Sequence, residues 1–144
     1  MADTVTQLLA ERADDDTTAI LSDAGQWTWR EYLADARATA AAVLQLADPQ
    51  RPMHIGVLLA NSPTMLIALA AGALGGYVTV GVNNTRRGQA LADDVLRADC
   101  QVLLTDDEHL SLLDGLELPG VTVVNTSDPA WAEQLAAAGE LTPV

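Results

Sequence analysis

A long uncharged segment restricts the possible folds most strongly. Residues 52–85 contain no Asp, Glu, Lys or Arg, as is typical of a membrane span or of a buried parallel sheet. The segment is interrupted by Asn-Ser-Pro at residues 61–63 and by Gly75 and Gly76. Its longest helical piece, residues 63–74, would rise about 18 Å against a hydrocarbon core of about 30 Å. The segment therefore predicts buried strands joined by an apolar helix, and no transmembrane segment.

Local signals divide this segment into a strand, a helix and a second strand. Residues 54–60 form an apolar run that is too short for a stable helix. Ser62 is a typical helix cap, and Pro63 follows at the first helical position, where its missing amide proton costs nothing. Residues 77–82 are expected to form the next strand.

The flanking segments extend the alternation of strands and helices. Upstream, we expect a short helix over residues 4–13 with an apolar stripe of Val5, Leu8 and Leu9, and a hairpin of residues 19–22 and 26–29. Thr28 and Glu31 fit a capping box that opens a long helix ending before residue 48. The downstream expectations are helices at 86–98, 109–116 and 131–138 and strands at 102–104 and 121–124.

This pattern predicts an α/β fold. We expect an open, mostly parallel, doubly wound and flavodoxin-like sheet flanked by helices, with a short N-terminal helix and a hairpin. Residues 1–144 are expected to form a single α/β segment.

Charge and cysteine content exclude several functions. The chain has 20 acidic residues, seven arginines and no lysine, for a net charge of −13. A broad basic face for nucleic acid or anionic membranes is therefore excluded, as is any chemistry that needs a lysine.

The lone Cys100 allows no internal disulfide and is expected in the core. With no apparent secretory signal, a cytoplasmic location is expected.

Ligands of open α/β sheets collect at the carboxyl ends of strands, so the loops there are the candidate sites. At residues 61–63, capping of the next helix accounts for all three residues. Asp106, Asp107 and Glu108 resemble a phospho-receiver pocket or a magnesium site. However, the receiver's lysine is absent, and acids ahead of a helix at His109 stabilise its dipole. We therefore predict no metal ligand here.

The glycines of this region do not fit a nucleotide loop. A dinucleotide fingerprint follows a strand and opens a helix, whereas Gly72, Gly75, Gly76 and Gly81 close a helix and enter the next strand. Close backbone packing and a helix C-cap explain them.

Two arginines are harder to explain. Arg86 and Arg87 fall in the first turn of the expected helix 86–98, where positive charge opposes the helix dipole. Neither has an acidic residue three or four positions later. A bound anion would account for them, but simple solvation remains the alternative.

Three stretches together resemble a known family. They are residues 28–33 (TWREYL), residues 55–63 running into the helix that ends at 72–76, and residues 82–91 continuing through 99–106. In order and spacing they are similar to the opening of the acyl-adenylate-forming superfamily, in particular its fatty-acyl-CoA synthetases. The turn of asparagines followed by Arg-Arg-Gly most resembles the branch for long and very long fatty acids, including the fatty-acid-transport type.

This resemblance implies an AMP-forming fatty-acid CoA ligase. Such enzymes use ATP and Mg²⁺ to convert a fatty acid into an acyl-adenylate, and the thiol of CoA then displaces AMP. The family's phosphate loop, its ribose-contacting acid and its late lysine have no counterpart here. We therefore expect the N-terminal subdomain of a larger enzyme, with no catalytic residue in this segment and no ligase activity alone. Residues 126–144 are expected to be a terminal helix cut from its context.

The resemblance also implies a CoA-facing loop. In related synthetases the loop after the strand corresponding to residues 77–82 approaches CoA, which makes Gly81, Val82 and Asn83 candidate CoA-binding residues. Arg86 and Arg87 are candidate phosphate contacts.

Two alternatives of other classes remain open. The first is a stand-alone flavodoxin-like or receiver-like binding module. The second is an interaction protein that pairs through its apolar sheet faces or through the helix 63–74. Truncation of a domain would likewise expose surfaces for self-association.

Overall fold

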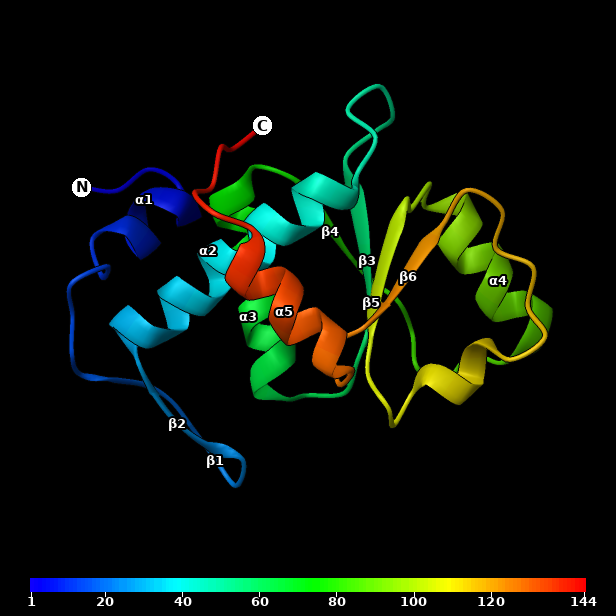
Figure 1. Ribbon diagram of the computed structural model, residues 1–144, viewed down its shortest axis with the longest axis horizontal. Coiled ribbons are helices and arrows are strands. Elements are labelled where there is room, and N and C mark those ends of the chain that lie inside the picture. Colours follow the sequence, from blue (N-terminus) through cyan, green and yellow to red (C-terminus); the bar gives the residue numbers. More distant parts are fainter.

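Four parallel strands form the centre of the computed structural model, which describes all 144 residues (Figure 1). They are β3 (His54–Leu58), β4 (Val78–Gly81), β5 (Val102–Thr105) and β6 (Thr122–Asn125), in the spatial order β4-β3-β5-β6. Every neighbouring pair is parallel. This is the order of the first four strands of a flavodoxin-like sheet, so the predicted parallel sheet is confirmed.

Helices cover both faces of this sheet (Figure 1). The helices α2 (Trp29–Leu46), α3 (Pro63–Gly75) and α5 (Pro129–Ala137) pack on one face. The helix α4 (Gly88–Arg97) and the short 3₁₀ helix η1 (Leu110–Leu113) lie on the other. The connection after β3 runs in one direction and those after β4 and β5 run in the other, so right-handed crossovers place their helices on opposite faces. The doubly wound prediction is thereby confirmed.

The alternation of side chains along the strands builds two separate cores. Ile55 and Val57 of β3 join the larger cluster under α2 and α3. Leu58 joins the smaller cluster, where Leu91 and Val95 of α4 pack. Because successive residues of a strand point to opposite faces, one short strand supplies both clusters.

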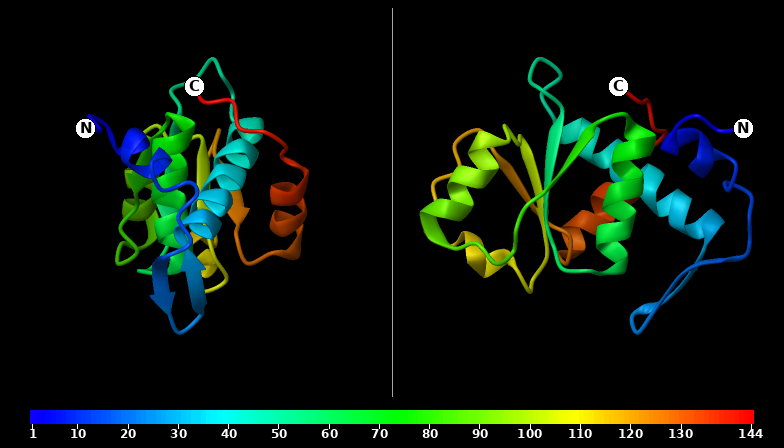
Figure 2. Two further views of the ribbon diagram at one scale, coloured as in Figure 1. Left: turned by 90° about the vertical axis from the view of Figure 1, so that its left-hand side faces the viewer. Right: turned by 180° about the vertical axis from the view of Figure 1, so that it is seen from behind.

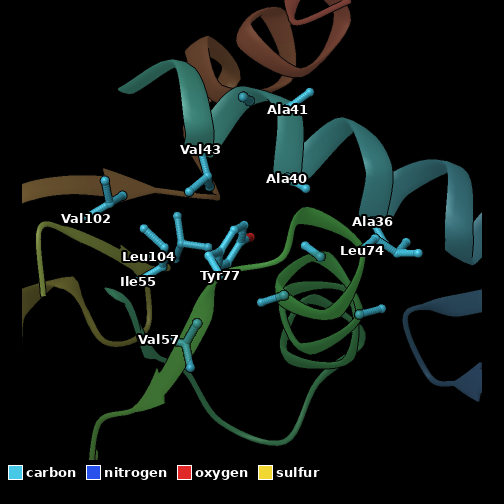
Figure 3. Packing of buried hydrophobic residues seen from close by; sticks show 14 of the residues in the cluster. Ala36, Ala40, Ala41, Val43, Ile55, Val57, Leu74, Tyr77, Val102 and Leu104 are labelled. Atoms are coloured by element: carbon cyan, nitrogen blue, oxygen red, sulfur yellow. The ribbon is translucent and has the colours of Figure 1, made fainter. Parts of the chain in front are cut away.

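The larger core depends on close approach of α2 and α3. Figure 3 shows Ala36 and Ala40 of α2 above α3, and the Tyr77 ring next to Ile55 and Leu104. A Cβ added to Gly75 would lie 2.7 Å from a ring carbon of Tyr77 and 3.2 Å from the Ala40 Cβ. Gly76 ends α3 with a left-handed φ of 77°. The predicted roles in close packing and capping are confirmed for Gly75 and Gly76. For Gly81 the expectation of close packing is wrong, because a Cβ placed on it would have no atom within 4 Å.

The first part of the chain forms a short helix and a separate hairpin (Figure 2). The helix α1 (Val5–Ala10) begins after its cap Thr4, and β1 (Thr18–Ser22) pairs antiparallel with β2 (Gly25–Thr28). Thr28 and Glu31 form the predicted capping box of α2. Arg30, in the first turn of α2, makes ion pairs with Asp14 and Asp16 of the segment that leads into the hairpin.

Several element boundaries differ from the expectations. The first helix ends at Ala10 rather than at residue 13, and its Val5 and Leu8 are exposed instead of forming a buried stripe. The helix expected over residues 109–116 is reduced to the single turn of η1. No helix of the structure has both the length and the apolar character needed to cross a bilayer.

Candidate functional site

The carboxyl ends of the four parallel strands bring the candidate loops to one edge of the sheet. The chain leaves β3 toward β4 on one side, while β5 lies on the other side of β3, so the topological switch point falls between β3 and β5. Thr105 Oγ1 donates a hydrogen bond of 3.0 Å to the Leu58 carbonyl and links these two strand ends. A ligand of this fold is therefore expected beside these loops.

The last residue of β4 and the loop that follows it carry all five CoA candidates, and hydrogen bonds within the loop hold it in place. Val82 is buried, whereas Asn83 accepts hydrogen bonds on Oδ1 from the amide (2.9 Å) and the hydroxyl (2.7 Å) of Thr85. Asn84 Nδ2 donates to the Leu59 carbonyl at 3.2 Å, which ties this loop to the loop after β3. Gly81 faces open space, with no atom within 4 Å of a Cβ placed on it.

The two arginines lie before α4 and not in its first turn. Arg87 is the N-cap residue and makes no side-chain capping bond, and the helix begins at Gly88. The prediction that Arg86 and Arg87 lie in the first turn of this helix and oppose its dipole is therefore wrong. Arg86 also has an acidic partner, because the loop folds back along the helix and brings Nε within 2.9 Å of Asp94 Oδ2.

Both guanidinium groups are held in place but keep unused donors. Arg86 uses Nε and Nη2 on the two oxygens of Asp94. Arg87 Nη1 donates to the carbonyls of Asn84 (2.7 Å) and Arg86 (2.8 Å). Since a guanidinium carries five N–H donors, each arginine retains N–H groups for an anion.

A depression of about 360 Å³ adjoins this loop. It is lined by residues 80–83 and by Asp94, Arg97 and Ala98 of the α4 side. It therefore brings together Gly81, Val82 and Asn83, whereas Arg86 and Arg87 both lie outside its lining. Arg97 was missed by the sequence analysis, because only the packing of α4 beside β4 places it here.

The acidic loop after β5 is explained by its own hydrogen bonds. Asp106 Oδ1 accepts from the His109 amide at 3.0 Å and lies 2.6 Å from His109 Nδ1. Asp107 Oδ1 accepts from Asn125 Nδ2 at 2.7 Å. Ligand atoms of Asp106, Glu108 and His109 lie within 4.8 Å of one another, a grouping that sequence spacing did not reveal.

The remaining candidates have structural roles. Ser62 Oγ accepts from the Met65 amide at 3.2 Å and caps α3, as predicted. Cys100 is buried, also as predicted, and burial together with the charge of Asp99 raises the pKa of its thiol. The thiol therefore stays protonated and unreactive at neutral pH.

The chain is similar in sequence to several known proteins. The family model described as AMP-binding enzyme matches residues 8–143. The chain is 40% identical over 135 residues to the medium/long-chain-fatty-acid–CoA ligase FadD17 of Mycobacterium tuberculosis, covering 93% of this chain and 26% of that protein. It is 36% identical to the steroid-22-oyl-CoA synthetase of Rhodococcus jostii, covering 24% of that protein.

The solved structures agree on the fold. The N-terminal domain of FACL13 from Mycobacterium tuberculosis superposes with a TM-score of 0.83 at 17% identity, over 99% of this chain and 38% of that one. The chain thus spans about a quarter of the length of the curated relatives that it matches. Because the family model accounts for nearly the whole chain, this protein belongs to the AMP-binding enzyme family.

Proposed function

We propose that this chain is the N-terminal subdomain of an AMP-forming ligase that joins medium- or long-chain fatty acids to CoA. The observation that carries the proposal is the 40% identity to a medium/long-chain-fatty-acid–CoA ligase over 135 residues. The family match over residues 8–143 supports the use of ATP. Placement in the very-long-chain or fatty-acid-transport branch stays a prediction from the turn at residues 83–88.

The proposed reaction of the longer enzyme has two steps. A carboxylate oxygen of the fatty acid attacks the α-phosphorus of ATP, and the bond to the leaving pyrophosphate breaks. The sulfur of CoA then attacks the acyl carbon, the bond to AMP breaks, and the thiol proton is released. Mg²⁺ would accompany the ATP phosphates. No catalytic residue is assigned to this segment.

The contribution of this segment to the chemistry is the CoA-facing loop after β4. Gly81 leaves its side of the loop open, and Val82 and Asn83 line the adjoining depression. The unused N–H donors of Arg86 and Arg87 suit a phosphate of CoA, which a guanidinium binds through paired hydrogen bonds. Arg97 at the same depression is a further cation that would attract it.

Titration calorimetry of the complete ligase with CoA tests this loop. We expect the Arg86→Ala, Arg87→Ala double variant to weaken CoA binding by about tenfold or more, since each charged hydrogen bond contributes about 1.5–3 kcal/mol. Arg37→Ala on α2, which removes a cation that makes no ion pair, is the charge control. Asp94→Asn, which weakens the hold on Arg86, should leave CoA affinity equal or higher. Unchanged affinity in the double variant would remove the assignment.

Pyrophosphate release tests the activity itself. With ATP and a medium- or long-chain fatty acid, the complete protein should release pyrophosphate and form acyl-CoA, and the 144-residue chain should not. Activity of the short chain would show that the assignment of the reacting groups to the remaining part of the enzyme is wrong.

A further inference from the structure

An apolar groove lies between the hairpin and α3, away from the CoA-facing loop. Its volume is about 380 Å³, and its apolar wall comprises Ile20 and Leu21 of β1 and Met65, Leu66 and Leu69 of α3. Ser22, Asn61, Ser62 and Pro63 complete the lining. None of the lining residues is charged, although the chain as a whole has 27 charged residues among 144.

The walls of this groove are more exposed than large apolar side chains usually are. Leu21 is 78% exposed, Leu69 is 50% exposed and Leu66 is 43% exposed. Leu66 and Leu69 are three positions apart and lie on one side of α3. The inner side of the same helix, with Ala68 and Ala71, is buried against the core. A helix that is apolar on both sides is typical of a layer that is covered on both sides.

The hairpin points to the same conclusion. The strands β1 and β2 form a sheet of two strands that is not hydrogen-bonded to the central sheet, and such a sheet is marginal unless further structure covers it. It continues directly into α2 through Thr28, which ends β2 and caps that helix, while Arg30 pairs with Asp16 just before β1. Figures 1 and 2 show it extending away from the body, beyond the start of α2.

We infer that the groove is the docking surface for the remaining part of the same polypeptide, in the longer ligase proposed above. The curated relatives match 93% of this chain with 26% or less of their own length. About three quarters of such an enzyme is therefore available to cover this face. An occupant with an apolar surface fits, because the uncharged groove offers no ion pair to a charged partner.

The position of the groove links it to the chemistry. Asn61 and Ser62 line it and also follow β3 at the topological switch point. A segment that fills the groove consequently lies beside the carboxyl edge of the sheet. That edge is where open α/β sheets bind their ligands.

Hydroxyl-radical footprinting of two polypeptides tests the inference. One is the 144-residue chain, and the other is the whole protein expressed from its gene. In the whole protein we expect labelling of Leu66, Leu69 and Met65 to fall about fivefold or more, because interface burial takes half-exposed side chains to a few per cent exposure. Leu96, which is 37% exposed on the opposite face in α4, is the internal control and should keep its labelling.

Three outcomes overturn the inference. One is equal labelling of the groove in both polypeptides. Another is protection that appears in the short chain as its concentration rises, which would make a second copy the occupant. The third is a Leu69→Glu variant of the whole protein that melts at the temperature of the matched Leu96→Glu variant. The inference expects the melting temperature of the Leu69→Glu variant to be clearly lower.

These results are separable from a failure of the proposed function. If the gene product proves to be 144 residues long, or a longer product releases no pyrophosphate, the ligase proposal fails. If a longer and active ligase leaves Leu66 and Leu69 fully labelled, only the docking surface fails.

Discussion

The helices α3 and α4 are consecutive crossovers of one sheet, on opposite faces, and they meet their surroundings differently. The outer side of α4 carries Asp93, Asp94 and Arg97, as expected of a helix whose layer ends in solvent. The outer side of α3 presents Leu66 and Leu69, and the helix contains no charged residue. The outer side of α4 is therefore suited to solvent, whereas the outer side of α3 is suited to packing against further structure.

The inner sides of the two helices differ as well. The helix α3 meets α2 through small residues, and glycines set the spacing. The helix α4 meets the sheet through the large side chains of Leu91 and Val95. The contact between α3 and α2 should therefore be sensitive to added atoms, and the contact between α4 and the sheet should be sensitive to removed atoms.

The largest expected effect comes from truncation on the α4 side. Leu91 is fully buried, and Leu91→Ala should lower the free energy of unfolding by about 2–5 kcal/mol through lost burial and a residual cavity. Urea denaturation of the 144-residue chain measures it. The control is Leu96→Ala on the same helix, where the exposed side chain predicts a change within about 0.5 kcal/mol. Similar losses in both variants would mean that the smaller core is loosely packed.

The α3 side should respond instead to a single added methyl group. Gly75→Ala places a Cβ against the stiff Tyr77 ring and the Ala40 methyl, and we expect a loss of about 1–3 kcal/mol. Gly81→Ala is the matched control, because its Cβ would meet nothing within 4 Å. That variant should be neutral or slightly stabilised. If Gly75→Ala is tolerated as well as Gly81→Ala, the two contacts do not differ in the way proposed.

The sequence predicted those features that depend on neighbours along the chain. The capping box of Thr28 and Glu31 and the Ser62 cap are local patterns, and the structure confirms both. The parallel, doubly wound sheet was also predicted, because handedness leaves few ways to connect alternating strands and helices. The start of α4 was misplaced by two residues, although Gly88, with its left-handed φ of 57°, was the available signal.

The site was less predictable for a physical reason. Arg86 reaches Asp94 eight residues later only because the loop folds back along α4, so helical spacing could not show the pair. Arg97 joins the depression beside Gly81 through tertiary packing, and the two residues are far apart in sequence. The five CoA candidates themselves came from a resemblance to a family, and calorimetry remains their test.

A buried hydroxyl at the contact between α3 and α2 gives a smaller effect of opposite sign. The Tyr77 hydroxyl has no hydrogen-bond partner in the structure, and burial raises its pKa. Tyr77→Phe should therefore raise the free energy of unfolding by about 1 kcal/mol, because it removes an unsatisfied polar group. The control is Tyr32→Phe, which loses a 2.8 Å hydrogen bond to the Leu66 carbonyl and should be destabilised by about 1 kcal/mol. Destabilisation by Tyr77→Phe would reveal a partner, such as an internal water.

The smallest expected effect is the pH dependence of stability near the hairpin, on the same side of the molecule as the exposed leucines of α3. Asp15 accepts from the hydroxyl (2.6 Å) and the amide (2.8 Å) of Thr17 and from Arg12 Nη1 (2.7 Å). These contacts, the Thr17 hydroxyl first, lower its pKa from 3.8 to about 2. Since the pKa is lower in the folded state, the stabilisation is complete above pH 3.8 and is lost as the pH falls toward about 2.

An Asp15→Asn variant should therefore lose stability relative to the parent protein at pH 5, and the difference should shrink as the pH approaches 2. The measurement is the urea midpoint across this range, with the Asp15 carboxyl titration followed by NMR. The control is Asp93→Asn on the outer side of α4, where the carboxylate accepts one side-chain hydrogen bond, from Gln89. Parallel pH profiles for the two variants would mean that the hairpin side is no more acid-sensitive than the solvent face of α4. If the stability of Asp15→Asn approaches that of the parent protein at low pH and the stability of Asp93→Asn does not, the acid sensitivity lies in the segment that leads into the hairpin.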